Sequence, residues 1–242
     1  RLNLSAWEIV AIVDRKAGDP AQVGTASARL LELDPLHHFV RAEAWLAGRS
    51  PSTLATLLDG LRSEYPDQTL LELAIAYARR GLTADAVALL DAVADRQRNP
   101  LLNLWAAFLK QDPSALAPSA DVAFVFPYRP ETLEALSWAV AHRGHWTWTY
   151  LLALNLWALD RLPEATERLI PLGNTPTHPS VYVSRAFLVE KSGGDPEVDL
   201  TRATALAGVS RTARIPLIQY YQRRGRWEAA AAASAEALGL LG

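Results

Sequence analysis

The chain of 242 residues lacks two residue types completely, cysteine and methionine. Without cysteine there is no disulfide framework, no thiolate-bound zinc or iron–sulfur cluster, and no cysteine nucleophile. A translation product starts with methionine, whereas this sequence contains none and starts at Arg1. We therefore expect a processed or excised piece of a longer protein.

An excess of one charge and long apolar runs are also absent. The 24 basic and 26 acidic side chains give a net charge of −2, which disfavours nucleic-acid binding because that activity needs a basic face. The longest apolar run, Tyr150–Leu159, is interrupted by Asn155 and is shorter than the about 20 residues of a membrane span. We expect neither nucleic acids nor membranes as partners, and a cytoplasmic location, slightly favoured, or a periplasmic one.

The sequence contains none of the common catalytic or cofactor motifs. Phosphate-cradling glycine loops, the GxSxG elbow and HExxH do not occur. His142 and His145 stand three residues apart at an expected helix end, where surface or capping histidines are the better interpretation. Asp195 and Glu197 resemble the acids that favour a helix start. We expect no catalytic residue, metal or cofactor, and no enzymatic activity in this chain.

A helix–turn–helix unit is visible between Asp67 and Val93. Apolar residues recur at helical spacing up to Tyr77, and again from Ala86 onward. Between the two stripes stands Gly81, a residue that without Cβ adopts the left-handed conformation that ends helices. The segment therefore predicts two antiparallel helices.

The same unit recurs along the chain. Its turn residues follow one another at intervals of 30, 33, 31, 48, 33 and 32, and they are Gly18, Gly48, Gly81, Asp112, Asp160, Gly193 and Gly225. The long interval contains the proline-rich stretch Pro118–Pro130, which cannot continue a helix. A lone helical stripe at Leu133, Leu136 and Val140 follows it. We predict a shortened repeat, an extended loop and one extra helix within 112–146.

This pattern resembles the tetratricopeptide repeat, a helical hairpin of about 34 residues. The residues that carry the resemblance are Leu73-Ala74, Tyr77, Gly81 and Ala86, then Trp7, Gly18 and Asp34-Pro35, and finally Tyr221, Gly225, Trp227 and Ala230. Asp14 and Ala44 depart from the family by standing where tyrosine is usual. The resemblance implies an all-α fold: a tetratricopeptide-like right-handed superhelix, or α-solenoid, of about seven hairpins in a single domain, 1–242.

Local strings carry a narrower resemblance. His37-His38-Phe39, Leu70–Ala74, Phe124–Glu131 and Tyr150–Leu154 are similar to the C-terminal repeat region of large bacterial proteins of unknown function. In those proteins a β-rich part similar to sugar mutarotases precedes the repeats. The resemblance implies a carbohydrate context.

The family's register assigns residues to the inner, concave face of such a superhelix. The candidate binding residues on that face are Trp45, Arg79, Lys110, Tyr150, Trp157, Gln219, Gln222 and Arg223. Arg79, Lys110 and Arg223 are the cations that we expect to meet carboxylates of a bound peptide, with arginine suited to bidentate contacts.

Two aromatic segments have two interpretations each. Trp146, Trp148, Tyr150 and Trp157, with Trp138 nearby, are either core residues, which we favour, or an aromatic wall for a peptide or sugar. The loop Phe124–Glu131 either packs across the superhelix as an apolar plug, which we favour, or docks a partner.

The function expected from these patterns is that of a non-catalytic scaffold or interaction module. A preformed concave face would bind a protein or peptide, or the missing N-terminal part of the same chain, at little entropic cost. One alternative is an accessory domain of a carbohydrate-active protein that contributes aromatic residues to a sugar site. Another alternative is an oligomerisation spacer.

Overall fold

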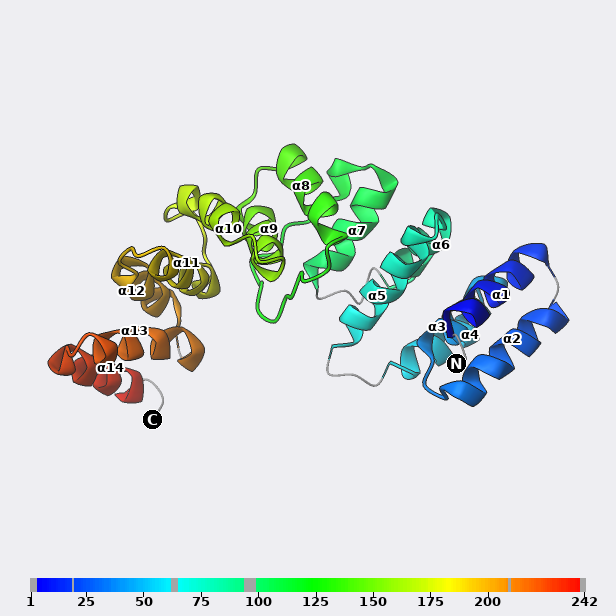
Figure 1. Cartoon of the computed structure of the whole chain (residues 1–242), viewed down its shortest axis with the longest axis horizontal. Helices are drawn as coiled ribbons and strands as arrows, with labels where there is room; N and C mark the ends of the chain where they lie inside the picture. Colours follow the sequence, from blue (N-terminus) through cyan, green and yellow to red (C-terminus); the bar gives the residue numbers. More distant parts are fainter. Residues whose placement is uncertain (1–3, 19, 62–64, 94–98, 209, 240–242) are drawn as a thin grey trace. The chain divides into compact units, whose positions relative to one another are not determined.

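The computed structural model describes residues 4–18, 20–61, 65–93, 99–208 and 210–239. Throughout these residues the regular structure is helical, with fourteen α-helices, two short 3-10 helices and no strand (Figure 1). The first seven helices are α1 (Leu4–Ala17), α2 (Pro20–Leu33), α3 (His38–Gly48), α4 (Pro51–Asp59), α5 (Pro66–Arg79), α6 (Thr83–Asp91) and α7 (Pro100–Lys110). After the 3-10 helix η2 (Pro113–Ala115) come α8 (Thr132–His142), α9 (Trp146–Ala158), α10 (Leu162–Leu169), η3 (Ile170–Leu172), α11 (Pro179–Lys191), α12 (Glu197–Leu206), α13 (Arg211–Arg223) and α14 (Trp227–Gly239). The expected all-α fold is confirmed.

The chain divides into two compact units, residues 1–110 and 111–242. The helices α1–α7 belong to the first unit, and α8–α14 belong to the second. The single repeat domain expected over 1–242 stays a prediction. Among the described helices, none combines the length and apolarity that crossing a membrane requires.

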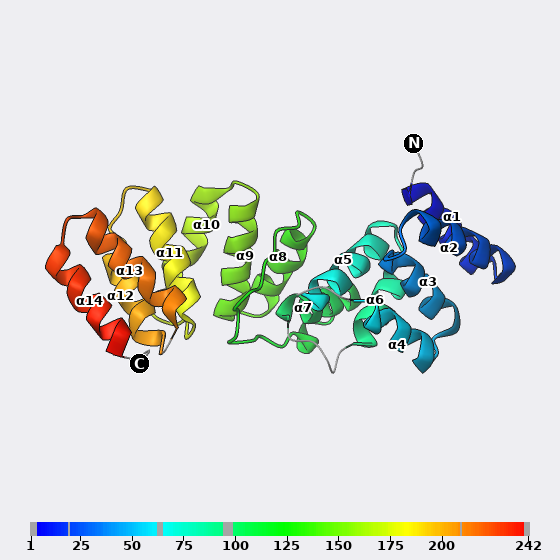
Figure 2. The ribbon, with the colours of Figure 1, turned by 90° about the horizontal axis from the view of Figure 1, so that it is seen from below.

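Consecutive helices pack as hairpins inside each unit. Unit 1 contains the pairs α1/α2, α3/α4 and α5/α6, and unit 2 contains α9/α10, α11/α12 and α13/α14 (Figure 2). Ala11, Ala74 and Ala153, the small residues expected where helices approach closely, are fully buried. A small side chain at these points lets backbones approach toward the lower end of the usual range of about 8–10 Å.

The predicted turn residues coincide with left-handed backbone. Gly18, Gly81, Asp160, Gly193 and Gly225 all have positive φ, and at the two remaining turns the neighbours Arg49 and Gln111 have it. At Gly81 the N–H of Leu82 donates to the carbonyl of Tyr77 at 3.0 Å, which closes the helix end in a Schellman motif. The corresponding bonds close the other hairpins that contain Asp160, Gly193 and Gly225.

Hydrogen bonds join residues that stand one repeat apart. The Tyr77 hydroxyl donates to Glu43 at 2.5 Å, 34 residues earlier in the chain. Tyr150 and Ser184 share a hydroxyl contact at 3.3 Å across the same separation. Arg223 donates to Glu190 at 3.0 Å, 33 residues away. These bonds join neighbouring hairpins at separations close to the expected repeat length.

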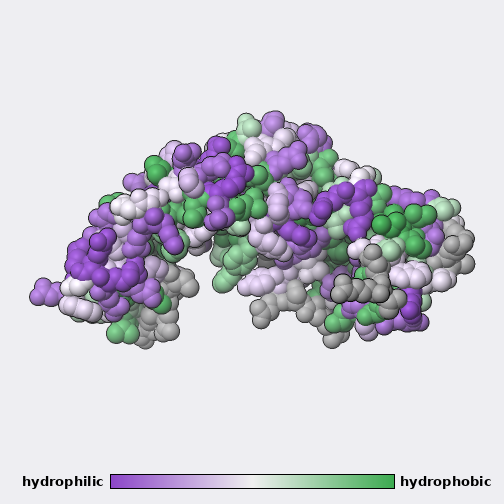
Figure 3. Space-filling model, in the orientation of Figure 1, coloured by the Kyte–Doolittle hydropathy of each residue, from purple (hydrophilic) through white to green (hydrophobic). Residues whose placement is uncertain are grey.

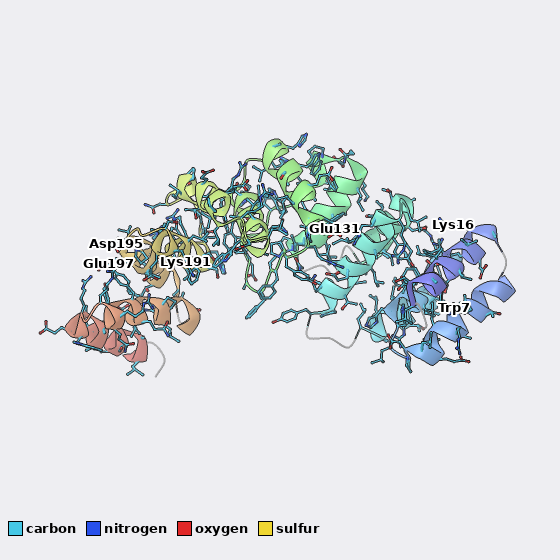
Figure 4. All side chains as sticks on the ribbon, in the orientation of Figure 1. Trp7, Lys16, Glu131, Lys191, Asp195 and Glu197 are labelled. Carbon is cyan, nitrogen blue, oxygen red and sulfur yellow. The ribbon has the colours of Figure 1, made fainter. Side chains whose placement is uncertain are left out.

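A buried ion network ties four helices of unit 1 together. Arg15 of α1 donates to Glu43 of α3 at 2.7 Å and to Asp85 of α6 at 2.9 Å. Glu43 is fully buried and also accepts the Tyr77 hydroxyl from α5. Lys16, labelled in Figure 4, adds a second cation at 2.8 Å from Asp85. The buried carboxylates are thus each compensated, which burial of charge requires.

A more exposed set of hydrogen bonds surrounds the start of α12 in unit 2. Asp195 accepts the Tyr220 hydroxyl at 2.9 Å, and Glu197 accepts the Tyr221 hydroxyl at 3.1 Å and Arg226 at 2.6 Å (Figure 4). These acids join α12 to α13 and to the turn after it. Their position at the helix start agrees with the interpretation from sequence.

The irregular section follows the expected order. A 3-10 turn stands in place of a second helix, the extended segment 116–131 follows, and the extra helix α8 begins at Thr132. In Figure 1 this green segment runs beside α9. Asn155 of α9 donates to the carbonyls of Pro127 and Arg129, which fixes the segment to the helix.

Candidate ligand-binding hollow

A small apolar pocket lies between this extended segment and α9 in unit 2. Its volume is about 260 Å³. Its lining residues are Val125, Phe126, Pro127 and Tyr128 from the segment, and Leu154, Trp157 and Ala158 from α9. The space-filling view shows hydrophobic surface, in green, where the segment lies (Figure 3).

A larger hollow of about 880 Å³ lies next to the pocket. The two cavities share Val125, Phe126 and Leu154. From there the larger hollow extends past Tyr150 to the first turns of α11 and on to the residues around Ala207 and Ala213. We call the pocket and this cavity together the unit 2 hollow. Its larger part has the size typical of ligand sites, about 300–1,000 Å³.

Helical spacing explains which residues of α9 face the hollow. Tyr150, Leu154, Trp157 and Ala158 follow one another at i, i+4, i+7 and i+8, which places them on one side of the helix. Asn155 is fully buried and holds the extended segment. One helix therefore both lines the hollow and carries its opposite wall.

The extended segment alternates between buried and exposed side chains. Val122 and Val125 are at most 5% exposed and Pro127 is buried. Phe124, Phe126 and Tyr128 are 70%, 54% and 48% exposed. Within the loop Phe124–Glu131, expected to be an apolar plug, Val125 and Pro127 are buried, whereas Phe124, Phe126 and Tyr128 present aromatic surface to solvent.

The polar groups of the hollow are neutral. The Tyr150 and Ser184 hydroxyls contact each other at 3.3 Å, and burial raises the pKa of Tyr150. The Nδ1 atom of His178 accepts the Ser180 N–H at 3.3 Å as the cap of α11. Burial lowers the pKa of His178, so this imidazole is uncharged at neutral pH. The described residues that line the hollow include no Asp, Glu, Lys or Arg.

The candidate residues in unit 2 separate into two groups. Tyr150 lines the larger hollow and Trp157 lines the smaller pocket. Gln219 and Gln222 are exposed on α13 and do not belong to the described lining. Arg223, on the same helix, forms an ion pair with Glu190 at 3.0 Å.

The candidate residues in unit 1 have individual surroundings. Trp45 is 5% exposed, and the Arg49 guanidinium lies over its ring at 5.5 Å from the centroid. Arg79 is exposed at the end of α5. Lys110 forms an ion pair with Asp91 at 2.6 Å. Trp45 is therefore packed inside the protein, and Lys110 already has a carboxylate partner.

The aromatic cluster around α9 is mainly core. Trp146, Trp148 and Tyr150 are at most 7% exposed. Trp138 and Trp157 are half-buried, and Trp157 stacks on Phe187 with ring centroids 5.0 Å apart. The favoured core interpretation thus describes the cluster, with Tyr150 and Trp157 also facing the hollow.

Sequence reasoning missed the contribution of α11. His178, Ser180 and Ser184 line the larger hollow but were not among the candidates. The signal for Ser184 is its position 34 residues after Tyr150, one repeat later. Within the described residues, no group of three or more His, Asp or Glu side chains is arranged to hold a metal ion.

Comparison of the sequence with models of protein families and with curated proteins gives no match. The geometry of the hollow is therefore the basis for a functional proposal.

Proposed function

We propose that this chain is a non-catalytic interaction module of tetratricopeptide-like hairpins in a right-handed superhelical stack, and that its unit 2 hollow holds a segment of a partner protein. One observation carries the proposal. Phe126 and Tyr128 stay about half exposed on a segment that hydrogen bonds fix beside an apolar pocket. Exposed apolar surface of this kind is typical of interaction sites.

The arrangement supports binding more than catalysis. Catalytic sites need a positioned acid, base or nucleophile. The titratable side chains among the described lining residues are Tyr128, Tyr150 and His178. The Nδ1 atom of His178 already caps α11. A preformed wall, in contrast, reduces the conformational entropy that a complex loses on binding.

Panning a random-peptide display library against the whole chain tests the proposal. We expect enriched peptides whose binding is lost in Phe126→Ser and kept in Trp227→Ser. Trp227 is 67% exposed on α14 and outside the described lining, so its replacement is a matched loss of exposed aromatic surface.

Two results would contradict the proposal. One is a library that yields no binder, and the other is a set of binders that Phe126→Ser retains. A change of tryptophan fluorescence on titration with oligosaccharides, absent in Phe126→Ser, would favour the carbohydrate alternative instead.

A further inference from the structure

The smaller pocket points to a more specific ligand chemistry. We infer that it is an anchor site for one uncharged apolar side chain, aromatic or leucine-sized, of a peptide segment that continues through the larger hollow. This inference rests on the proposed function and adds the chemical class of the partner segment.

The size of the pocket fits one side chain. Its volume of about 260 Å³ lies below the about 300–1,000 Å³ of pockets that enclose a whole small ligand. The adjoining cavity of about 880 Å³ shares Val125, Phe126 and Leu154 with it. A ligand that fills both must be long, with one apolar group in the pocket and the rest of the chain beyond it.

Charge complementarity favours an uncharged segment. The described residues that line the pocket itself are all uncharged. Four are aliphatic, Val125, Pro127, Leu154 and Ala158, and three are aromatic, Phe126, Tyr128 and Trp157. An ionised group placed there loses part of its hydration and finds no opposite charge among these residues. An aliphatic or aromatic side chain, in contrast, is stabilised there because its apolar surface leaves water.

Hydrogen-bonding capacity separates an apolar side chain in the pocket from a sugar ring. A sugar presents many hydroxyls, and each needs a partner when it leaves water. The described residues that line the smaller pocket offer two polar side-chain groups, the Tyr128 hydroxyl and the Trp157 indole N–H. Phe187 also covers one face of the Trp157 ring, and ring faces are where sugars would stack.

The wall of the pocket is fixed before any ligand arrives. The buried Asn155 amide donates to the backbone carbonyls of Pro127 and, at 2.8 Å, of Arg129. These two carbonyls flank Tyr128, so the backbone on both sides of that ring is held to α9. The Thr147 hydroxyl holds the same segment farther upstream by donating to the Ser119 carbonyl at 2.7 Å. A rigid wall favours one well-defined anchor side chain over many weak contacts.

The experiment uses peptides recovered from the random library on the whole chain. We expect the recovered pool to be depleted of Asp, Glu, Lys and Arg at one shared position occupied by Phe, Trp, Leu or Met. In a synthetic copy of one recovered peptide, Asp and Lys at that position should each weaken binding by roughly tenfold or more, measured by fluorescence anisotropy.

Variants of the protein connect this position to the pocket. Leu154→Ala enlarges the pocket, and Tyr128→Ser removes a wall side chain that is 48% exposed. Each variant should reduce the difference between the apolar peptide and its Asp copy, whereas Trp227→Ser should leave it unchanged. Melting curves identify a variant that fails to fold.

The possible outcomes separate the two proposals. Binders that share a charged position, or that accept Asp at every position, would overturn the inference while leaving peptide binding intact. A library without binders would overturn both. Binders with an apolar anchor whose preference Tyr128→Ser does not change would also overturn the inference, because the anchor would then lie elsewhere.

Discussion

At the scale of single residues, the contacts that matter join positions far apart in the chain. Lys110 and Arg223 were expected to meet the carboxylates of a ligand, yet they contact Asp91 and Glu190 of their own units. Composition and helical periodicity do not identify such partners. The repeat period does contain part of this information, because Arg223 and Glu190 stand 33 residues apart. Tyr150 and Ser184 stand 34 residues apart.

Asp85 is a residue whose charge stabilises unit 1. It is 2% exposed and accepts hydrogen bonds from Arg15 and Lys16. Burial alone would raise the pKa of Asp85, but the hydrogen bonds from these two cations outweigh it and lower that pKa. Because the folded-state pKa is below the unfolded value of about 4, the ionised group stabilises the fold above that pH. This contribution is lost as the pH falls through the folded-state pKa.

We predict that Asp85→Asn lowers the thermal midpoint at neutral pH. Removing one partner of a buried ion pair costs about 3 kcal/mol or more, and the lower end applies because Arg15 retains Glu43. The difference from the unsubstituted chain should shrink as the pH falls below about 4. Melting curves followed by circular dichroism at several pH values measure it.

Asp91→Asn is the matched control. Asp91 pairs with Lys110 on the surface of the same unit, where an ion pair contributes about 0–1 kcal/mol. An Asp85→Asn penalty that is the same at neutral and acidic pH would show that packing, and not charge, is responsible.

At the scale of helices and turns, the sequence was more informative. A turn residue such as Gly81 reports on local backbone conformation, and its φ of 73° needs no distant partner. The extended segment 116–131 was harder to predict, because its path depends on Asn155 and Thr147 about 28 residues later. Its position as a loop was visible from its prolines, but the alternation of buried and exposed side chains was not.

Two glycine substitutions test the turn chemistry. An added Cβ has open space at both Gly81 and Gly48, so neither substitution causes a clash. Gly81 has positive φ, whereas Gly48 is the last residue of α3. Gly81→Ala should destabilise by about 1–2 kcal/mol through left-handed strain. Gly48→Ala should be neutral or stabilising by up to about 1 kcal/mol.

Urea unfolding followed by circular dichroism compares these two variants with the unsubstituted chain. Equal effects at the two positions would contradict the assignment of Gly81 to an obligatory left-handed turn.

At the scale of the whole molecule, the division at Lys110 and Gln111 separates two sets of buried contacts. Unit 1 contains the Arg15–Glu43–Asp85 network and its own apolar core. Unit 2 contains the fixed segment, α9 and the hollow. In repeat proteins stability is approximately a sum over repeats and their neighbours, so each unit holds a share of the total.

We predict that fragments 1–110 and 111–242 each fold when expressed alone, and that binding of library-selected peptides remains with 111–242. The reason is that the walls of the hollow and the hydrogen bonds that fix them all come from residues after 110. Helical circular dichroism with a cooperative melting transition checks folding, and fluorescence anisotropy compares peptide affinity with that of the whole chain. A folded fragment 111–242 with clearly weaker binding would mean that residues 1–110 contribute to the site. Binding by fragment 1–110 would contradict our proposal, because recognition would then lie in unit 1 and not in unit 2.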